Sequence, residues 1–98
     1  MVRGTTPENI FKLPFILDDV KSLYVTYSQG DTVVLDKAID DVIIDGNTIT
    51  VRLTQEDTLK FSNAQVNIQI RFKTNQGKAM ASNIISTYVN NVLKDGVI

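Results

Sequence analysis

The chain has 98 residues, enough for one domain with a single core but too few for two. It contains no histidine or cysteine, which weighs against imidazole acid–base catalysis, disulfides and sites for zinc, iron or copper. Ten basic and eleven acidic residues give a formal net charge of −1, so nothing attracts the chain generally to nucleic acid or anionic lipid. We therefore expect a protein that is not an enzyme and that binds no cofactor, nucleic acid or membrane.

The N-terminal residues predict neither export nor a regular element. Met1 to Gly4 is followed by polar residues rather than the apolar core of a secretory signal, and no apolar run is long enough to span a membrane. Residues 1–8 show no hydrophobic period and predict a flexible lead-in.

The first expected strand lies in an apolar cluster between Ile10 and Phe15, and Pro14 stands inside it. Because proline cannot donate a hydrogen bond to a neighbouring strand, this strand should lie at the edge of a sheet or be interrupted there.

Two hairpins are expected next. Residues 20–39 alternate between apolar and polar side chains on either side of Gly30, which can adopt the positive φ of a turn. Asp45-Gly46 separates two β-branched runs within residues 42–54. An Asp-Gly pair in this setting is the strongest short-range hairpin signal in the chain.

Residues 54–61 break the alternation and predict one short helical turn near residues 55–60. The Thr54 hydroxyl can accept a hydrogen bond from the free N–H groups at the start of the turn, where Asp57 also favours the positive end of the helix. We expect this turn to plug one end of the core.

The clearest strand pattern in the chain lies at residues 66–73. Four apolar residues there alternate with four polar ones, the period of a strand with one buried face. The following residues 78–89 are less regular and predict a strand with a bulge or a kink. The tail, residues 90–98, fits a short helix and a strand extension equally well.

Together these elements predict an all-β fold: a single immunoglobulin-like antiparallel β-sandwich of about seven strands, with one helical turn, over residues 1–98. A small closed barrel would give the same signals. No repeat or linker divides the chain, so we expect one domain.

Few groups suggest chemistry. Asp40, Asp41 and Asp45 could form an oxygen cage for calcium, but their spacing matches no EF-hand loop, and we interpret them as residues of turns and strand ends. The Glu56-Asp57 pair is better explained by helix capping than by acid–base catalysis. A metal site is therefore not expected.

Basic side chains at predicted outward positions need a separate explanation. Arg52, Arg71 and Lys73, with Tyr24 or Tyr88 for stacking, could form a platform for nucleic acid. The balanced net charge favours a solvated face instead.

Apolar residues near both chain ends have a functional interpretation. They either cap the core or form a surface for self-association or docking of a partner. This candidate interaction surface comprises Phe11, Phe15, Val92, Leu93, Val97 and Ile98.

Nearly the whole chain resembles a group of small proteins encoded by phages and prophages of low-GC Gram-positive bacteria, found among tail and baseplate genes. The resemblance is carried by Arg3-Gly4-Thr5-Thr6-Pro7, Leu13-Pro14-Phe15, Val25-Thr26-Tyr27-Ser28-Gln29-Gly30, Leu53-Thr54-Gln55-Glu56-Asp57-Thr58-Leu59-Lys60-Phe61 and Val92-Leu93-Lys94-Asp95-Gly96-Val97-Ile98. The group is also similar in plan to the N-terminal immunoglobulin-like domain of phage baseplate upper proteins.

The resemblance implies a β-sandwich structural or accessory protein of a phage tail or baseplate, with no catalytic residues. Its location would be the virion or the cytoplasm of the bacterial host, and its partners other tail proteins or further copies of itself. The chain lacks the Cys…Trp…Cys pattern of true immunoglobulin domains, so its similarity to immunoglobulin-like domains concerns the architecture alone.

A second hypothesis is a small module that binds carbohydrate or a host surface. Its aromatic platform would have to come from Tyr24, Tyr27 and Tyr88, because the chain has no tryptophan.

Overall fold

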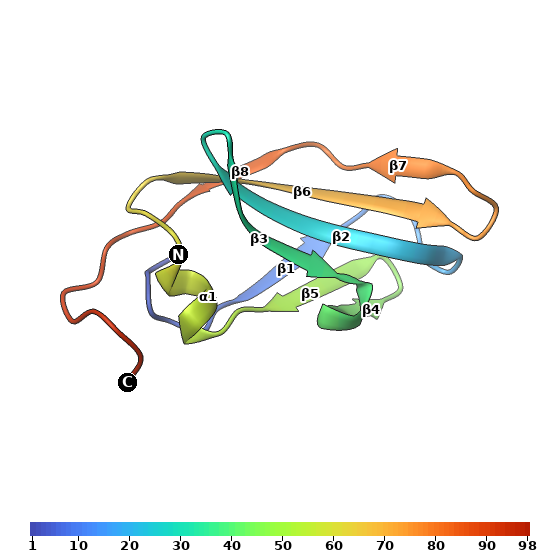
Figure 1. Cartoon of the computed structure of the whole chain (residues 1–98). Coiled ribbons are helices and arrows are strands. Elements are labelled where there is room, and N and C mark those ends of the chain that lie inside the picture. Colours follow the sequence, from blue (N-terminus) through green and yellow to red (C-terminus); the bar gives the residue numbers. More distant parts are fainter.

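Two antiparallel sheets face each other in the computed structural model, which describes all 98 residues (Figure 1). The elements in chain order are β1 (Glu8–Lys12), β2 (Val20–Gln29), β3 (Thr32–Ala38), the 3₁₀ turn η1 (Ile39–Asp41), β4 (Ile43–Asp45), β5 (Thr48–Arg52), α1 (Gln55–Leu59), β6 (Gln65–Thr74), β7 (Ala79–Ala81) and β8 (Ile85–Tyr88). The smaller sheet has the order β1-β5-β4. The larger has the order β3-β2-β6, and both β7 and β8 pair with the free side of β6.

This strand order is that of an immunoglobulin-like sandwich. The smaller sheet has the order of strands B, E and D, and the larger has the order C′, C, F and G, with β7 and β8 sharing the place of G. Counted in this way the sandwich has the seven strands expected. The predicted all-β sandwich is confirmed, and the two separate sheets rule out the closed barrel.

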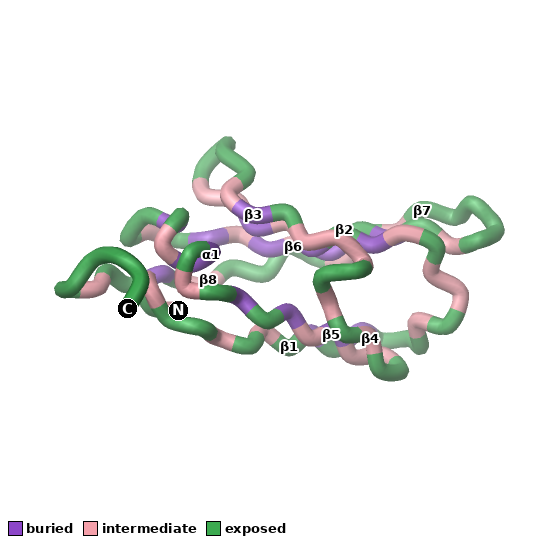
Figure 2. Tube along the Cα trace, turned by 60° about the horizontal axis from the view of Figure 1, so that its bottom comes forward, coloured by how far each residue is buried: buried purple, intermediate pink, exposed green.

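The alternation of side chains along the strands places the core between the sheets. Fifteen hydrophobic residues form one buried cluster to which both sheets contribute (Figure 2). β6 supplies Val66, Ile68, Ile70 and Phe72, the apolar face that its sequence predicts. Its polar side chains point away from the core. β6 lies inside the larger sheet because it pairs with β2 on one side and with β7 and β8 on the other.

Both predicted hairpins are confirmed. β2 and β3 are joined through Gly30 at φ +58°, and β4 and β5 through Gly46 at φ +61°. A positive φ is strained for residues that carry a Cβ atom, which explains glycine at these two turns.

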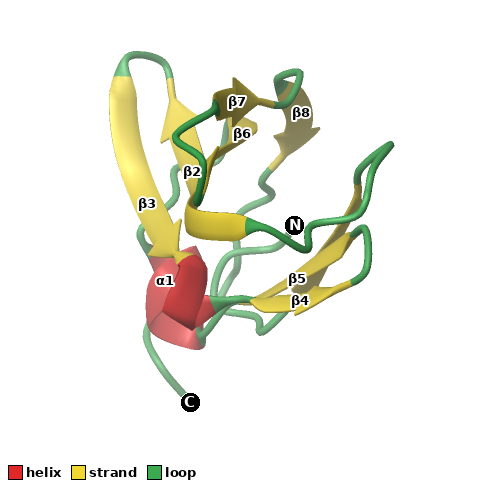
Figure 3. Ribbon diagram, turned by 90° about the vertical axis from the view of Figure 1, so that its right-hand side faces the viewer, coloured by secondary structure: helices red, strands yellow, loops and turns green.

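The predicted helical turn is also confirmed, as α1. The Thr54 hydroxyl accepts from the backbone N–H of Asp57 at 3.1 Å, and the Asp57 carboxylate accepts from the N–H of Thr54 at 3.0 Å. The buried ring of Phe61, just after the helix, lies 6.0 Å from the ring of Tyr27. The turn thus brings an aromatic side chain into one end of the core. Figure 3 shows α1 next to the C-terminal end of β3, whose Lys37 donates to Asp57 of the helix at 2.9 Å.

The last strand is interrupted where the sequence predicts a bulge or kink. Between β7 and β8 the hydroxyl of Ser82 accepts from the N–H of Ile70 at 3.0 Å, and the N–H of Ser82 donates to the carbonyl of Ile70 at 2.8 Å. A side chain thus replaces one backbone acceptor of the ladder. η1, by contrast, is a second short helical segment that the sequence does not predict.

The start of the predicted flexible lead-in is tied to the C-terminal part of the chain. The Met1 ammonium donates to the carbonyl of Tyr88 at 2.8 Å, and the N–H of Arg3 donates to the carbonyl of Asn90 at 3.0 Å. Glu8 already belongs to β1. Residues 1–3 are therefore not loosely attached, and the flexibility of the remaining lead-in stays a prediction.

Candidate binding surface on the larger sheet

The outer face of the larger sheet is the polar side of β2 and β6. The register places Tyr24 opposite Arg71 and Ser22 opposite Lys73. Because the residues between them turn into the core, these side chains stand side by side on the solvent face. The sequence predicts which side chains of each strand point outward, and the register shows which of them are neighbours across the two strands.

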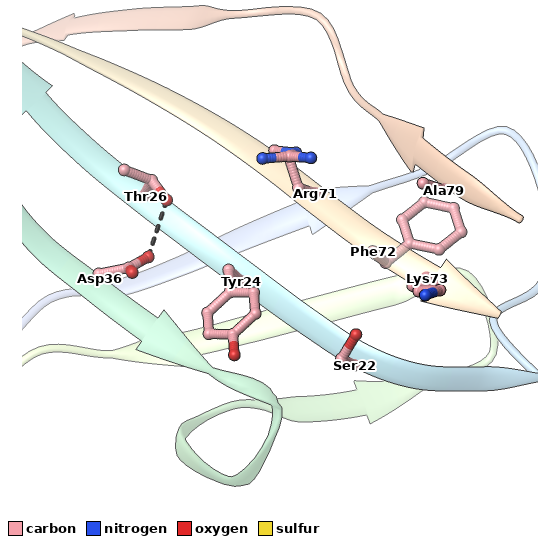
Figure 4. A pocket seen from close by; sticks show the side chains of 8 residues that line it. All are labelled: Ser22, Tyr24, Thr26, Asp36, Arg71, Phe72, Lys73 and Ala79. Carbon is pink, nitrogen blue, oxygen red and sulfur yellow. Dashed lines mark hydrogen bonds between the residues drawn. The ribbon is translucent and has the colours of Figure 1, made fainter. Parts of the chain in front are cut away.

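A hollow of about 320 Å³ lies on this face (Figure 4). β2, β3, β6 and β7 all contribute to its lining. The lining residues are Ser22, Tyr24, Thr26, Asp36, Arg71, Phe72, Lys73 and Ala79.

The hollow combines an aromatic ring with unpaired cations. The Tyr24 side chain is 47% exposed, so much of its ring is open to a ligand. Asp36 accepts a hydrogen bond from the Thr26 hydroxyl at 2.8 Å, whereas Arg71 and Lys73 take part in no ion pair. A ring, a guanidinium and an ammonium together suit a ligand that offers a flat apolar surface and an acceptor or anionic group.

A second hollow of about 450 Å³ shares Thr26 and Arg71 with the first. It adds the amide groups of Asn67 and Gln69 and the exposed apolar side chain of Ile84. The outer face is therefore a shallow, mixed surface with hydrogen-bonding groups on both sides of Arg71.

The two groups whose pKa values are clearly shifted lie elsewhere, and both have structural causes. Burial raises the pKa of Tyr27 to about 12, although a hydrogen bond from Asn9 acts to lower it. Burial also acts to raise the pKa of Asp57, but hydrogen bonds from Thr54 and Lys37 and the charge of Lys37 lower it overall. The Tyr27 hydroxyl bonds to an amide inside the sandwich, and Asp57 caps α1.

The aspartates considered for calcium do not gather around a common point. No three acidic side chains of the chain are grouped as a metal site would require. Asp41 instead accepts a hydrogen bond from the N–H of Ala38 at 3.0 Å at the start of η1, and Asp45 ends β4. Both thus occupy the turn and strand-end positions predicted as the alternative.

The three tyrosines do not form one aromatic platform. Tyr27 is fully buried, and its hydroxyl accepts from Asn9 Nδ2 at 2.8 Å, so it belongs to the core. Tyr88, on β8, is exposed opposite Gln65, at the other end of β6 from Arg71. Only Tyr24 remains as an aromatic contact beside Arg71.

No family model, curated protein or solved structure matches this chain. No helix of the structure could cross a lipid bilayer.

The apolar residues predicted as an interaction surface separate into two groups, one in β1 and the segment that follows it and the other in the C-terminal tail (Figure 1). In the first group, Phe11 is buried in β1, and Phe15 is 37% exposed with its ring 5.6 Å from that of Phe72. Phe11 is therefore a core residue and can contact no partner directly. Phe15 stays partly available.

The tail residues lie beside α1. Val92 is partly buried, whereas Leu93, Val97 and Ile98 are exposed. The tail is tied down by Asp95, whose carboxylate lies 3.5 Å from Arg3, and by the N–H of Ile98, which donates to Gln55 Oε1 at 3.0 Å. The exposed side chains therefore project from a segment that is attached to the fold.

Proposed function

We propose that this chain is a non-enzymatic structural or accessory protein of a phage or prophage tail or baseplate that acts through protein–protein contacts. The phage setting comes from the resemblance of its sequence to small tail-associated proteins. The mode of action is supported by one observation: large apolar side chains stay exposed both in the segment after β1 and in the C-terminal tail.

Each of the two segments exposes more than one large apolar side chain. Phe15 and Ile16 are exposed after β1, and Leu93, Val97 and Ile98 are exposed in the tail. Grouped apolar side chains at the surface of a small soluble domain typically become buried in contacts with other proteins. Two separate groups of this kind suit a component that contacts more than one neighbour in an assembly.

The proposal is tested by locating the protein in particles. Particles are purified from a lysogen that produces an epitope-tagged copy, and the tag is detected by immunogold electron microscopy. We expect gold at the tail tip or along the tail. A chain that is missing both from purified particles and from tail-assembly intermediates contradicts the proposal.

A second candidate function is binding of a carbohydrate or host surface by the outer face, and the open Tyr24 ring beside Arg71 favours it. Aromatic rings stack on sugars, and a guanidinium binds their hydroxyl or anionic groups. The test is a glycan array with the wild-type protein, Tyr24→Ala and, as a control, Tyr88→Ala. This function predicts hits that only Tyr24→Ala removes; an array without hits argues against it.

A further inference from the structure

Strand β1 is a regular edge strand whose outward hydrogen-bonding groups are free. Two backbone hydrogen bonds flank the pairing of β1 with β5. The N–H of Leu13 donates to the carbonyl of Asn47 at 2.8 Å, and the N–H of Leu53 donates to the carbonyl of Pro7 at 3.0 Å. Antiparallel strands alternate between hydrogen-bonded and non-bonded positions, so odd-numbered residues of β1 face β5. The N–H and C=O groups of Glu8, Ile10 and Lys12 must then point away from the sheet, where no other strand pairs with them.

The other sheet edges carry features that discourage pairing. β4 has three residues, and β7 and β8 divide their edge between them. The pairing of β3 with β2 is disturbed by a register shift between Tyr27 and Ser28. Short, interrupted or bulged edges resist the addition of another strand, whereas the register of β1 with β5 is unbroken over five residues.

The sequence of β1, Glu-Asn-Ile-Phe-Lys, is complementary to itself in the antiparallel direction. A two-fold axis at Ile10 places this residue opposite its copy and places Glu8 opposite Lys12 on both sides. All three residues have their free backbone groups on the open edge, so each opposed pair can exchange two hydrogen bonds. We propose that two copies of this chain associate through β1 in this register and form one continuous six-stranded sheet.

Neighbouring registers are worse, which makes this one specific. A shift of the copy by two residues in one direction brings Glu8 opposite Pro14, which has no N–H to donate. The same shift in the other direction brings Glu8 opposite Ile10 and Lys12 opposite Thr6, which removes both opposite-charge pairs. Larger shifts bring Glu8 opposite Glu8 or Lys12 opposite Lys12, and opposed like charges destabilise a strand pair. The register centred on Ile10 therefore combines the backbone bonds with opposite charges.

Side chains on the outside of the smaller sheet would extend the contact. Ile10, 66% exposed, lies beside Thr50, and Thr50 lies beside Ile43, 47% exposed. In the dimer the two Ile10 side chains would be in contact at the centre, whereas Ile43, on β4, would stand two strands away from the paired edges. Glu8, which accepts from Arg52 Nε at 3.0 Å, would lie between Arg52 and the copy's Lys12.

The same arrangement predicts a modest affinity. A two-fold pairing of edges closes on itself and stops at the dimer. An edge of five residues buries less surface than a permanent interface, so the dimer should dissociate on dilution. This inference specifies a partner for the proposed function but does not need the phage setting, since purified protein suffices for the test.

The test is sedimentation velocity over a concentration series of the purified chain. We expect a reversible monomer–dimer equilibrium for wild type. Ile10→Lys places two ammonium groups at the two-fold axis and should weaken dimerisation by about tenfold or more. Ile43→Lys makes the same change on the same face but on β4, two strands away from the paired β1 edge, and this control should keep the wild-type dimer.

A charge exchange tests the register and guards against misfolded variants. Glu8→Lys and Lys12→Glu each place like charges opposite one another, so each alone should be mainly monomeric. Mixed together they should form a heterodimer, because opposite charges then face each other again. The inference is overturned if the wild-type chain stays monomeric at every concentration or forms larger oligomers, or if the Ile10→Lys variant dimerises like wild type. None of these outcomes would bear on whether the protein is located in the tail.

Discussion

At the residue scale, Asp57 links α1 to the larger sheet. Its carboxylate accepts from the N–H of Thr54 at 3.0 Å and from Lys37 Nζ, on β3, at 2.9 Å, and the side chain is largely buried. These partners favour the charged carboxylate more than burial opposes it, so the pKa of Asp57 in the folded protein lies below its ordinary value of 3.8.

A lowered pKa in the folded state makes stability depend on pH in the acid range. The stabilisation by Asp57 is fully present above its unfolded pKa and is lost as the pH falls through the lower folded pKa. Asp57→Asn should lower the free energy of unfolding by about 1 to 2 kcal/mol at neutral pH and by less in acid. Urea unfolding over a pH series measures this. Glu56→Gln, in the same turn but exposed, is the control; a difference between Asp57→Asn and wild type that is constant with pH contradicts the prediction.

Tyr27 sets a corresponding limit at alkaline pH. Burial raises its pKa to about 12 from 10.0 in the unfolded chain, so its contribution is complete below pH 10 and is lost as the pH rises through the folded value. Tyr27→Phe should remove the part of the loss of stability at alkaline pH that is due to ionisation of Tyr27. It should also cost about 1 kcal/mol at neutral pH, because Asn9 loses its acceptor. Unfolding followed from neutral to alkaline pH gives both values, and Tyr24→Phe, at an exposed position, should keep the wild-type loss.

At the scale of the element, α1 is held at both ends. Thr54 and Asp57 cap its start, and the Arg3 guanidinium donates to the carbonyls of Leu59 and Phe61 at its end, at 3.1 and 2.8 Å. Arg3→Met should therefore lower the free energy of unfolding by about 1 to 2 kcal/mol. Arg71→Met, which removes an exposed arginine without such bonds, should change it by less than about 0.5 kcal/mol. Equal urea midpoints for the two variants would show that the cap by Arg3 contributes little.

The strands and turns that the sequence predicts are those determined by local physical rules. β2, β5 and β6 each bury one face, so alternation identifies them and their inward side chains. Gly30 and Gly46 mark turns because few other residues adopt a positive φ. The cap of Arg3 on α1 and the bonds of Ser82 to Ile70 join distant parts of the chain, and no local pattern announces them.

At the scale of the whole molecule, the candidate surfaces depend on where the chain leaves its regular strands. Phe11 turns inward with the alternation of β1, but the strand ends before Pro14, so the alternation gives no direction for Phe15. The outward side of Tyr24, Arg71 and Lys73 follows from their strands, whereas their closeness follows from the register of β2 with β6. Sequence periodicity thus predicts faces, and the positions of residues on a face require the pairing of the strands.

The position of the C-terminal tail allows stability and partner binding to be separated. Leu93, Val97 and Ile98 are exposed, and only the contacts of Asp95 with Arg3 and of Ile98 with Gln55 attach the end of the chain. Exposed contacts of this kind contribute little, so deletion of residues 93–98 should lower the free energy of unfolding by less than about 1 kcal/mol. If the tail contacts a neighbour in the particle, the same deletion should prevent incorporation of the folded protein into tails.

A stability control keeps the two effects distinct. Val89→Ala leaves the exposed tail intact but shortens a fully buried side chain, and it should cost about 1 to 3 kcal/mol. Urea unfolding and immunogold counts on purified particles are measured for both variants. Because a tail contact depends on the exposed side chains and not on global stability, the Val89→Ala protein should enter particles while the deleted protein should not. Normal incorporation of the deleted protein would exclude the tail as a contact, and would leave the β1 edge, the outer face and the exposed Phe15 and Ile16 as the surfaces available to partners.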